Sequence, residues 1–298
     1  MGLNRREFLK ASGAVWGTAV LGTGISTLTT QEGSVAEAAG PAPLYEIYAL
    51  KYAGPFTRKL AYALYGKGWD ENIEINYYIW VIKGKDEFIV VDTGCGLSGA
   101  KQRKLTPYVN PVEILTRIGV DGSNVRKVVM THMHFDHVGG MEMFPASFPK
   151  ATFYVQKKEY DFWTKNPFSK RPQFNRDEVA LKAMADLEGT DRLVLICGDQ
   201  KILPGIEVLL APGHTPGLQA VAVNTAKGTA FVASDLSHIH RALREDLTGT
   251  VYTDLISSLS SYDKIKARAT SIDLVFVGHD AKLFTDFPKV AEDITRLV

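Results

Sequence analysis

The sequence predicts an α+β protein in which the chain beyond residue 41 forms one domain, with β-sheets in the middle and helices outside. Short segments rich in β-branched and aromatic residues alternate with helix-like segments from residue 45 to the C-terminus. The sequence has no internal repeat of roughly 20–50 residues and no low-complexity linker after residue 41. At 298 residues, the chain is also long enough to bury a sizeable core.

The β character is strongest in ten short segments. The turn at residues 84–86 predicts a hairpin between the second and third of them, and the apolar run ending before Thr131 predicts a buried strand. The predicted strands cover residues 45–49, 77–83, 87–92, 125–130, 151–156, 192–196, 206–210, 220–224, 229–233 and 274–277.

Three further segments predict helices. Residues 111–118 begin with Pro111 and are followed by Gly119, which is the usual asymmetry of helix ends. Residues 253–269 and 286–297 are the other two predicted helices. Residues 53–76 and 165–189 lack a clear core pattern, and we predict that they form loops or lids over a site.

The N-terminus resembles a twin-arginine signal peptide. Arg5 and Arg6 precede an uncharged stretch at residues 11–28, and a small-x-small pattern suited to signal peptidase ends at Ala38. A cytosolic helix or a permanent anchor is the alternative, but four glycines in this stretch disfavour a helix. The resemblance implies that the export machinery recognises residues 1–38. Residues 39–298 would then be periplasmic or secreted, with no stable membrane insertion after cleavage.

Composition excludes several classes of protein. Lys and Arg total 34 against 33 Asp and Glu, so the net charge of +1 argues against a broad nucleic-acid surface. Apolar residues at 45% and charged residues at 22% exclude a wholly disordered chain. Two cysteines are too few for a disulfide scaffold. The sequence leaves the oligomeric state open, a dimer included.

The sequence concentrates its chemistry in one loop. His132, His134, Asp136 and His137 follow directly after the strand predicted at 125–130. In an extended loop His132 and His134 point the same way, whereas Asp136 and His137 lie where the chain turns into the next element. One loop can therefore serve two metals side by side, and imidazole and carboxylate ligands favour zinc or a similar divalent ion.

This loop matches the signature of the metallo-β-lactamase fold superfamily. Further matching motifs follow in family order: the turn at residues 91–94, the Gly-His-Thr-Pro-Gly loop at 213–217, Ser-Asp at 234–235 and Gly-His-Asp at 278–280. The resemblance covers roughly residues 45–290. It implies an αβ/βα sandwich of two mostly antiparallel sheets flanked by helices, with the metals at one edge of the two sheets.

Carried over residue by residue, the resemblance implies two metal sites that share one carboxylate. The first site would hold His132, His134 and His214; the second Asp136, His137 and His279; and Asp235 would bridge both. Asp92 would fix a histidine tautomer by a hydrogen bond rather than bind metal. Taken singly, the later ligands could be turn, cap or surface residues.

Two zinc ions about 3.5–4 Å apart can hold an activated bridging hydroxide, which predicts a hydrolase without a serine or cysteine nucleophile. Several segments resemble the N-acyl-homoserine lactonases, including residues 131–140 and 156–160. The resemblance implies a lactone-opening enzyme with Asp136 and His238 as catalytic residues. Many of these lactonases have a substrate-contacting tyrosine where this chain has His238. Histidine can donate a similar hydrogen bond, but His238 and His240 could instead line a polar loop.

Two alternatives remain at this stage. The same scaffold also serves ester, thioester and organophosphate hydrolases. From a different class, the chain could be a periplasmic metal-binding protein without catalysis. An intact set of seven ligands favours the enzyme.

Overall fold

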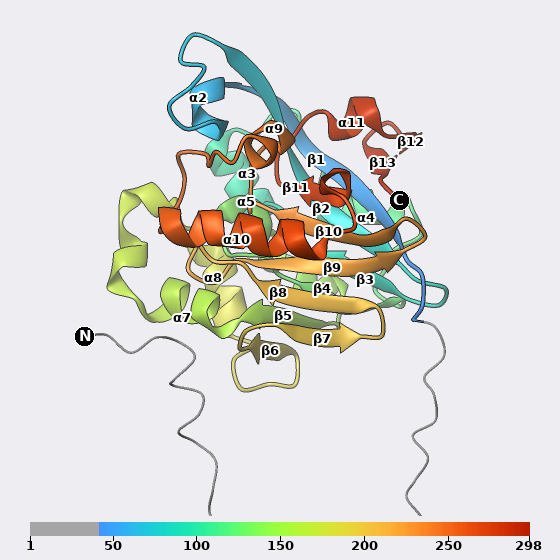
Figure 1. Ribbon diagram of the computed structural model, residues 1–298. Helices are drawn as coiled ribbons and strands as arrows, with labels where there is room; N and C mark the ends of the chain where they lie inside the picture. The colour runs from blue at the N-terminus through green and yellow to red at the C-terminus, as the bar shows by residue number, and fades with distance from the viewer. Residues whose placement is uncertain (1–41) are drawn as a thin grey trace, which may run out of the picture. The chain divides into compact units, whose positions relative to one another are not determined.

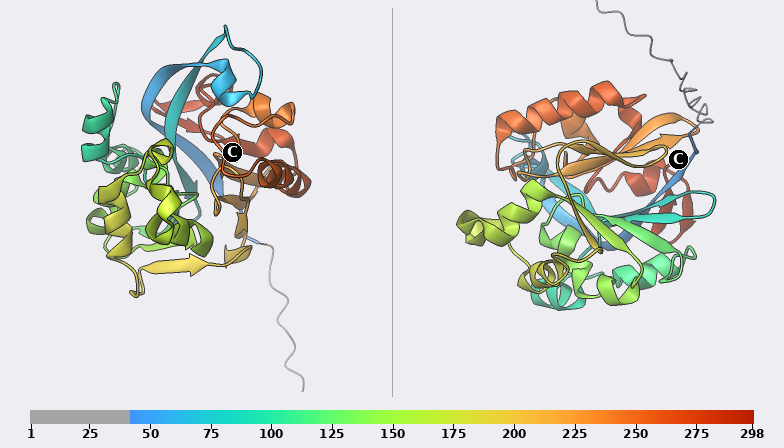
Figure 2. Two further views of the ribbon diagram at one scale, coloured as in Figure 1. Left: turned by 90° about the vertical axis from the view of Figure 1, so that its left-hand side faces the viewer. Right: turned by 90° about the horizontal axis from the view of Figure 1, so that it is seen from below.

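Two β-sheets packed face to face form the centre of the fold, with helices on their outer faces (Figures 1 and 2). The computed structural model describes residues 42–298, so the features expected in residues 1–38 lie outside the described residues. The first sheet has eight strands in the order β12-β13-β1-β2-β3-β4-β5-β6, and the second has five in the order β11-β10-β9-β8-β7. The predicted sandwich of sheets and helices is confirmed.

The strand bounds follow the predicted segments closely in the middle of the chain. In order along the chain, the strands are β1 (Glu46–Lys59), β2 (Asn72–Lys83), β3 (Phe88–Val91), β4 (Val125–Val129), β5 (Thr152–Gln156), β6 (Leu193–Ile196), β7 (Gln200–Leu203), β8 (Ile206–Leu210), β9 (Gln219–Thr225), β10 (Gly228–Ser234), β11 (Val275–Val277), β12 (Lys289–Ala291) and β13 (Ile294–Arg296).

Helices cover the outer face of each sheet. The α-helices are α2 (Leu60–Ala63), α3 (Leu97–Arg103), α4 (Pro111–Thr116), α5 (Phe135–Val138), α6 (Phe144–Ser147), α7 (Lys157–Lys165), α8 (Glu178–Ala185), α9 (His240–Arg244), α10 (Leu255–Arg268) and α11 (Leu283–Asp286), and the 3₁₀ helices are η1 (Gly139–Glu142), η2 (Pro167–Lys170), η3 (Pro172–Phe174) and η4 (Ile272–Leu274). Within residues 42–298, none of them combines the length and apolar character that a membrane span requires.

The core has three layers because side chains alternate across each strand. Trp80 of β2 and Val91 of β3 point between the sheets, where they meet residues of the second sheet such as Val221 and Val232. On the outer face of the first sheet, alternate residues of the same strands pack against α4 and α8. The helix α10 covers the outer face of the second sheet, as Figure 2 shows from below.

Strand direction determines where loops meet. The pairs β3–β4, β4–β5, β5–β6 and β10–β11 are parallel, and the other pairs in residues 42–298 are antiparallel. Antiparallel pairs outnumber parallel ones in both sheets, as expected. Parallel neighbours end at the same edge, so the loops after β3 and β4 emerge together, and so do those after β10 and β11.

The structure corrects three sequence predictions. Residues 286–297 do not form a helix: β12 and β13 make a hairpin there, and β13 pairs with β1 at the sheet edge. The β-branched side chains of this segment suit that ladder, which local periodicity could not reveal. Residues 53–76 are a loop only at 64–71, since β1 continues to Lys59 through irregular pairing that hides the alternation, and α2 and the start of β2 flank the loop. Residues 165–189 contain the helix α8, which begins at an Asp177 cap.

Candidate metal centre

The seven sequence-predicted ligands come together where strands of both sheets end. The loop after β4 brings His132 to His137, the β8–β9 loop brings His214, and the ends of β10 and β11 bring Asp235 and His279. The two sheets are joined at this edge, because the Gln219 backbone N–H donates to the Thr131 carbonyl at 2.9 Å. The expected grouping of these residues is therefore present in the fold.

His132, His134 and His214 form the first cluster. The Nδ1 atom of His134 lies 3.0 Å from His132 Nε2 and 2.8 Å from His214 Nε2. The far nitrogen of His214, Nδ1, lies 2.9 Å from the Val251 carbonyl, which can only accept a hydrogen bond. Nδ1 therefore carries the proton, and Nε2 turns a lone pair toward its neighbours. Burial lowers the pKa of the His214 imidazole to about 3, so this ring is neutral.

Asp136, His137 and His279 form the second cluster. Asp136 Oδ2 lies 3.7 Å from His137 Nε2 and 3.6 Å from His279 Nε2. The His279 ring donates from Nδ1 to the Asn76 carbonyl at 3.0 Å. Asp136 itself is placed by its backbone, whose carbonyl accepts the buried Tyr52 hydroxyl at 2.7 Å. These contacts turn one carboxylate and two imidazoles toward one point.

Asp235 lies between the two clusters. Its Oδ2 atom is 3.3 Å from His214 Nε2 and 3.0 Å from His279 Nε2, and its Oδ1 atom is 3.4 Å from His137 Nε2. Gly278 packs against this carboxylate so closely that a Cβ there would lie 2.0 Å from Oδ1, so the strand end accepts only glycine without a shift. The Asp235 carboxylate therefore contacts histidines of both clusters.

The centre fits divalent cations by the chemistry of its own atoms. His137 Nε2 and Asp235 Oδ1 are buried and have no hydrogen-bond partner among residues 42–298. Burial alone would lower the pKa of His137, but the carboxylates of Asp235 and Asp136 raise it well above its usual value. Burial alone would raise the pKa of Asp235, but His279 and His137 hold it well below its usual value. The carboxylates therefore favour a positive charge at this point, and the lone pairs of the neutral imidazoles in the first cluster lie beside it.

Asp92 supports the second cluster from beneath, as predicted. Its carboxylate is fully buried and lies 2.8 Å from His137 Nδ1. It also accepts hydrogen bonds from the Thr131 backbone N–H at 2.6 Å and the Thr131 hydroxyl at 2.7 Å. Asp92 therefore orients an imidazole and fixes the start of the ligand loop.

Glu159 holds the ligand loops of the first cluster, a role that sequence reasoning missed. This fully buried carboxylate accepts hydrogen bonds from the backbone N–H groups of Met133 and Gly217, both at 2.9 Å. It also accepts one from Trp163 Nε1 at 2.7 Å. Met133 lies between two ligands and Gly217 follows the third. The residue stands in the segment at 156–160, but its neighbours in sequence give no sign of this function.

His238 faces the same centre, three residues after Asp235. Its Nε2 atom lies 3.5 Å from Asp235 Oδ2, and its side chain is 3% exposed. His238 groups with His214 and Asp235 closely enough to be counted among potential ligands. His240, by contrast, lies 2.7 Å through Nε2 from the Ile272 carbonyl, outside the clusters.

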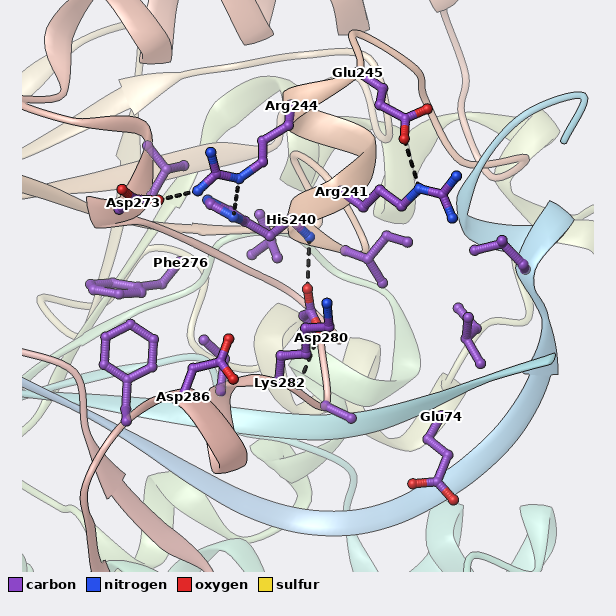
Figure 3. A pocket seen from close by; sticks show the side chains of 18 of the residues that line it. Glu74, His240, Arg241, Arg244, Glu245, Asp273, Phe276, Asp280, Lys282 and Asp286 are labelled. Atoms are coloured by element: carbon purple, nitrogen blue, oxygen red, sulfur yellow. Dashed lines mark hydrogen bonds and ion pairs between the residues drawn. The ribbon is translucent and has the colours of Figure 1, made fainter. Parts of the chain in front are cut away.

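A cavity of about 960 Å³ lies beside the centre and contains none of the seven candidate ligands. Figure 3 shows it, lined by residues of α9, α11 and the strands β2 and β11. At its wall, the Asp280 carboxylate accepts the His240 backbone N–H at 2.9 Å, which ties the loop after His279 to the loop after His238. The cavity thus borders the backs of two site loops.

Comparison with known proteins identifies the class of this centre. Residues 74–279 match the model of the metallo-beta-lactamase superfamily, and the chain belongs to that superfamily. An N-acyl homoserine lactonase from a Bacillus species is 25% identical over 226 residues, covering 70% of this chain and 83% of the relative. The N-acyl homoserine lactonase AttM of Rhizobium radiobacter is 30% identical over 192 residues, covering 61% of this chain and 68% of the relative.

Solved structures agree on the fold. A quorum-quenching N-acyl homoserine lactone lactonase superposes with a TM-score of 0.65 at 21% identity, covering 83% of this chain and 96% of the other. AidC, described as a dizinc quorum-quenching lactonase, superposes with a TM-score of 0.62 at 21% identity, covering 80% of this chain and 89% of the other. The chain is therefore a hydrolase-superfamily member with a candidate metal centre of histidine and aspartate.

Proposed function

We propose that this protein is a dinuclear zinc hydrolase that opens lactone rings, with N-acyl-homoserine lactones as the first candidates. The observation that carries the proposal is the pair of side-chain clusters that share Asp235. The names of its relatives, N-acyl homoserine lactonases, support the choice of substrate.

The metal assignment follows the clusters. His132, His134 and His214 would hold one ion; Asp136, His137 and His279 would hold the other; and Asp235 would bridge them. Nitrogen and oxygen ligands of this kind suit zinc. When bound, two such ions supply a water nucleophile at neutral pH and polarise the substrate carbonyl.

The protein groups around the metals have separate tasks. No hydrogen bond from residues 42–298 reaches the Asp136 side chain. Its Oδ1 atom can therefore take the proton of the attacking water and pass it to the ring oxygen when the C–O bond breaks. The imidazole of His238 lies beside Asp235 and would donate a hydrogen bond to the lactone carbonyl oxygen. Neither step needs a serine or cysteine nucleophile.

Two other functions compete with this one. An ester, thioester or organophosphate hydrolase would use the same centre, and a structure described as hydrolase AbOPH superposes with a TM-score of 0.61 at 19% identity. A non-catalytic metal-binding protein would keep the metals without turnover. The buried partnerless atoms His137 Nε2 and Asp235 Oδ1 support metal binding in every one of these cases.

We also propose that residues 1–38 direct export by the twin-arginine machinery and that residues 39–298 act in the periplasm or outside the cell. The arginine pair at residues 5 and 6 supports this proposal. The twin-arginine route carries folded proteins, which suits a chain that must load its metals before it leaves the cytosol.

A hydrolysis screen tests the function directly. Metal-replete protein would be offered N-acyl-homoserine lactones, other lactones, β-lactams, thioesters and phosphotriesters, with metal content measured on the same sample. We expect two metals per chain and the highest kcat/KM on a lactone. Turnover confined to another class would replace the lactonase proposal with that class, and two bound metals without turnover would favour the non-catalytic alternative.

A further inference from the structure

A tyrosine from a distant part of the chain lies against His238. The rings of Tyr62, in α2, and His238 are parallel, with an interplanar angle of 2° and a centroid separation of 4.9 Å. The two residues are 176 positions apart in the sequence (238 minus 62), so the fold rather than local sequence makes this pair. The stack covers one face of the imidazole that faces Asp235.

The segment that carries Tyr62 is held in place by backbone hydrogen bonds. The Tyr62 carbonyl accepts the Thr250 backbone N–H at 2.9 Å, and the Tyr65 backbone N–H donates to the Thr248 carbonyl at 2.8 Å. The same loop supplies the Val251 carbonyl that orients His214. Tyr62 is therefore fixed relative to the centre by the loop that also positions a candidate ligand.

Gly249 is required for this approach. A Cβ at this position would lie 2.7 Å from His238 Nδ1 and 3.0 Å from the Tyr62 carbonyl oxygen. The first distance is shorter than real Cβ atoms allow, and the second is at the limit. A residue larger than glycine would therefore separate the loop from the stacked pair. The pair is thus built into the packing of α2 on residues 248–251.

The Tyr62 hydroxyl remains available as a donor. It makes no hydrogen bond with another group in the described part of the chain, and its ring is only partly buried. Burial, and then the negative charges of Asp235 and Asp136, raise the pKa of Tyr62 above its ordinary value. The Tyr62 phenol therefore stays protonated at neutral pH, and it lies close enough to both carboxylates to feel their charge.

We propose that Tyr62 is a further catalytic residue, whose hydroxyl donates a hydrogen bond to the carbonyl oxygen of the bound substrate beside His238. The inference rests on the proposed hydrolase function and extends it. The Tyr62 ring from α2 stacks on His238, and His238 in turn lies 3.5 Å from Asp235, so the phenol lies beside the candidate centre. The substrate class is a carboxylic ester or lactone with an acceptor oxygen.

The test compares Tyr62→Phe with the parent and with Tyr65→Phe. Phenylalanine keeps the ring that stacks on His238 and removes only the hydroxyl. Tyr65 is a matched control because it lies three residues along, is 52% exposed and packs edge-on against Tyr252 instead of His238. Metal content, Tm, kcat and KM would be measured for all three on the best lactone and on p-nitrophenyl acetate.

We expect Tyr62→Phe to lower kcat roughly tenfold to hundredfold, a smaller loss than for a sole oxyanion donor because a metal shares the task. KM should rise as well, because the hydroxyl also bonds the bound substrate. Metal content and Tm should stay near the parent values, and Tyr65→Phe should match the parent throughout. A parent-like kcat for Tyr62→Phe on both substrates would overturn the inference. A loss of metal or of Tm in proportion to kcat would assign Tyr62 a structural role and overturn it as well.

A binding measurement separates this inference from the lactonase proposal. If the parent hydrolyses p-nitrophenyl acetate but no lactone, the substrate proposal fails while the comparison of variants still decides the role of Tyr62. If the parent hydrolyses neither substrate, calorimetric titration of the zinc-loaded protein with N-hexanoyl-L-homoserine tests the role of Tyr62. Weaker binding by Tyr62→Phe alone supports the donor. Equal affinity in the parent and the variant, or no binding by the parent, overturns it.

Discussion

Replacing Glu159 by glutamine should weaken the first metal site without unfolding the protein. The carboxylate holds the backbone of both ligand loops of the first cluster, through Met133 N and Gly217 N, each at 2.9 Å. The amide of glutamine has the same shape. Its oxygen can still accept from Met133 and Trp163, but its NH₂ group then faces the Gly217 N–H, so two donors meet.

The expected magnitude follows from these contacts. The variant loses one charge-assisted hydrogen bond, which contributes about 1.5–3 kcal/mol. Changes to groups that orient metal ligands typically cost about tenfold to hundredfold in affinity, or about 1.4–2.7 kcal/mol. Burial also raises the pKa of Glu159, so the ionised side chain carries a desolvation cost that glutamine avoids. We therefore expect zinc affinity to change more than Tm.

Stepwise zinc titration of the metal-free protein against a chromophoric chelator measures the effect. One of the two binding steps should weaken in Glu159→Gln, and the other should match the parent. Glu188→Gln is a matched control, because Glu188 also accepts a hydrogen bond, from Tyr160 at 2.8 Å, but its side chain is 49% exposed. Two binding steps of parent affinity in Glu159→Gln would refute the idea that this carboxylate supports the site.

Changes at four further places test the centre and the export route. Asp235→Ala should empty both metal sites or disorder their ligands. His134→Ala should lose the first metal and most of the activity. If Asp235→Ala kept full turnover and two tightly bound metals, the bridging role of Asp235 would be wrong. His238→Ala should lower turnover roughly tenfold to hundredfold, about 1.4–2.7 kcal/mol, with metal content intact. His238→Tyr should retain much of the activity. If His238→Ala turned over its best lactone at the parent rate, His238 would have no catalytic role and would only line the loop. Replacing Arg5 and Arg6 by lysine should leave the protein unprocessed in the cytosol, as fractionation and the mass of the chain would show; normal processing would count against the twin-arginine route.

The sequence predicts the strands best where they are buried and rich in apolar residues. The central strands β3, β4, β5 and β8 are rich in β-branched and other apolar residues, most of which are buried, so their positions follow from composition. The C-terminal hairpin does not, because β12 is exposed and its ladder depends on meeting β13 and β1. The extension of β1 past Ala53 is hidden by irregular pairing near Gly54 and Pro55.

Some residues of the candidate site could likewise be predicted from the sequence, and others could not. The loop from His132 to His137 is dense enough to indicate metal by itself, and family order adds the distant ligands His214 and His279. Glu159 and Tyr62 could not be found in this manner. Their partners lie in loops that are remote in sequence, as with Gly217, 58 residues after Glu159. Their functions depend on which loops the fold brings together, and no local spacing encodes that.

The centre consists of two halves with separate supports. Glu159 fixes the loops of the first cluster, while Asp92 fixes His137 in the second through a contact of 2.8 Å. Within residues 42–298 no hydrogen bond joins Glu159 to Asp92. The clusters meet through Asp235, through the rings of His132 and His137, whose centroids are 4.1 Å apart, and through the His137 backbone N–H, which donates to the His134 carbonyl at 3.0 Å. A change at Glu159 should therefore leave the second cluster intact, whereas a change at Asp235 cannot spare either cluster. Under the proposed function, the two metal sites would thus be coupled through Asp235 and through the loop from His132 to His137 that serves both clusters, at the edge where the two sheets meet.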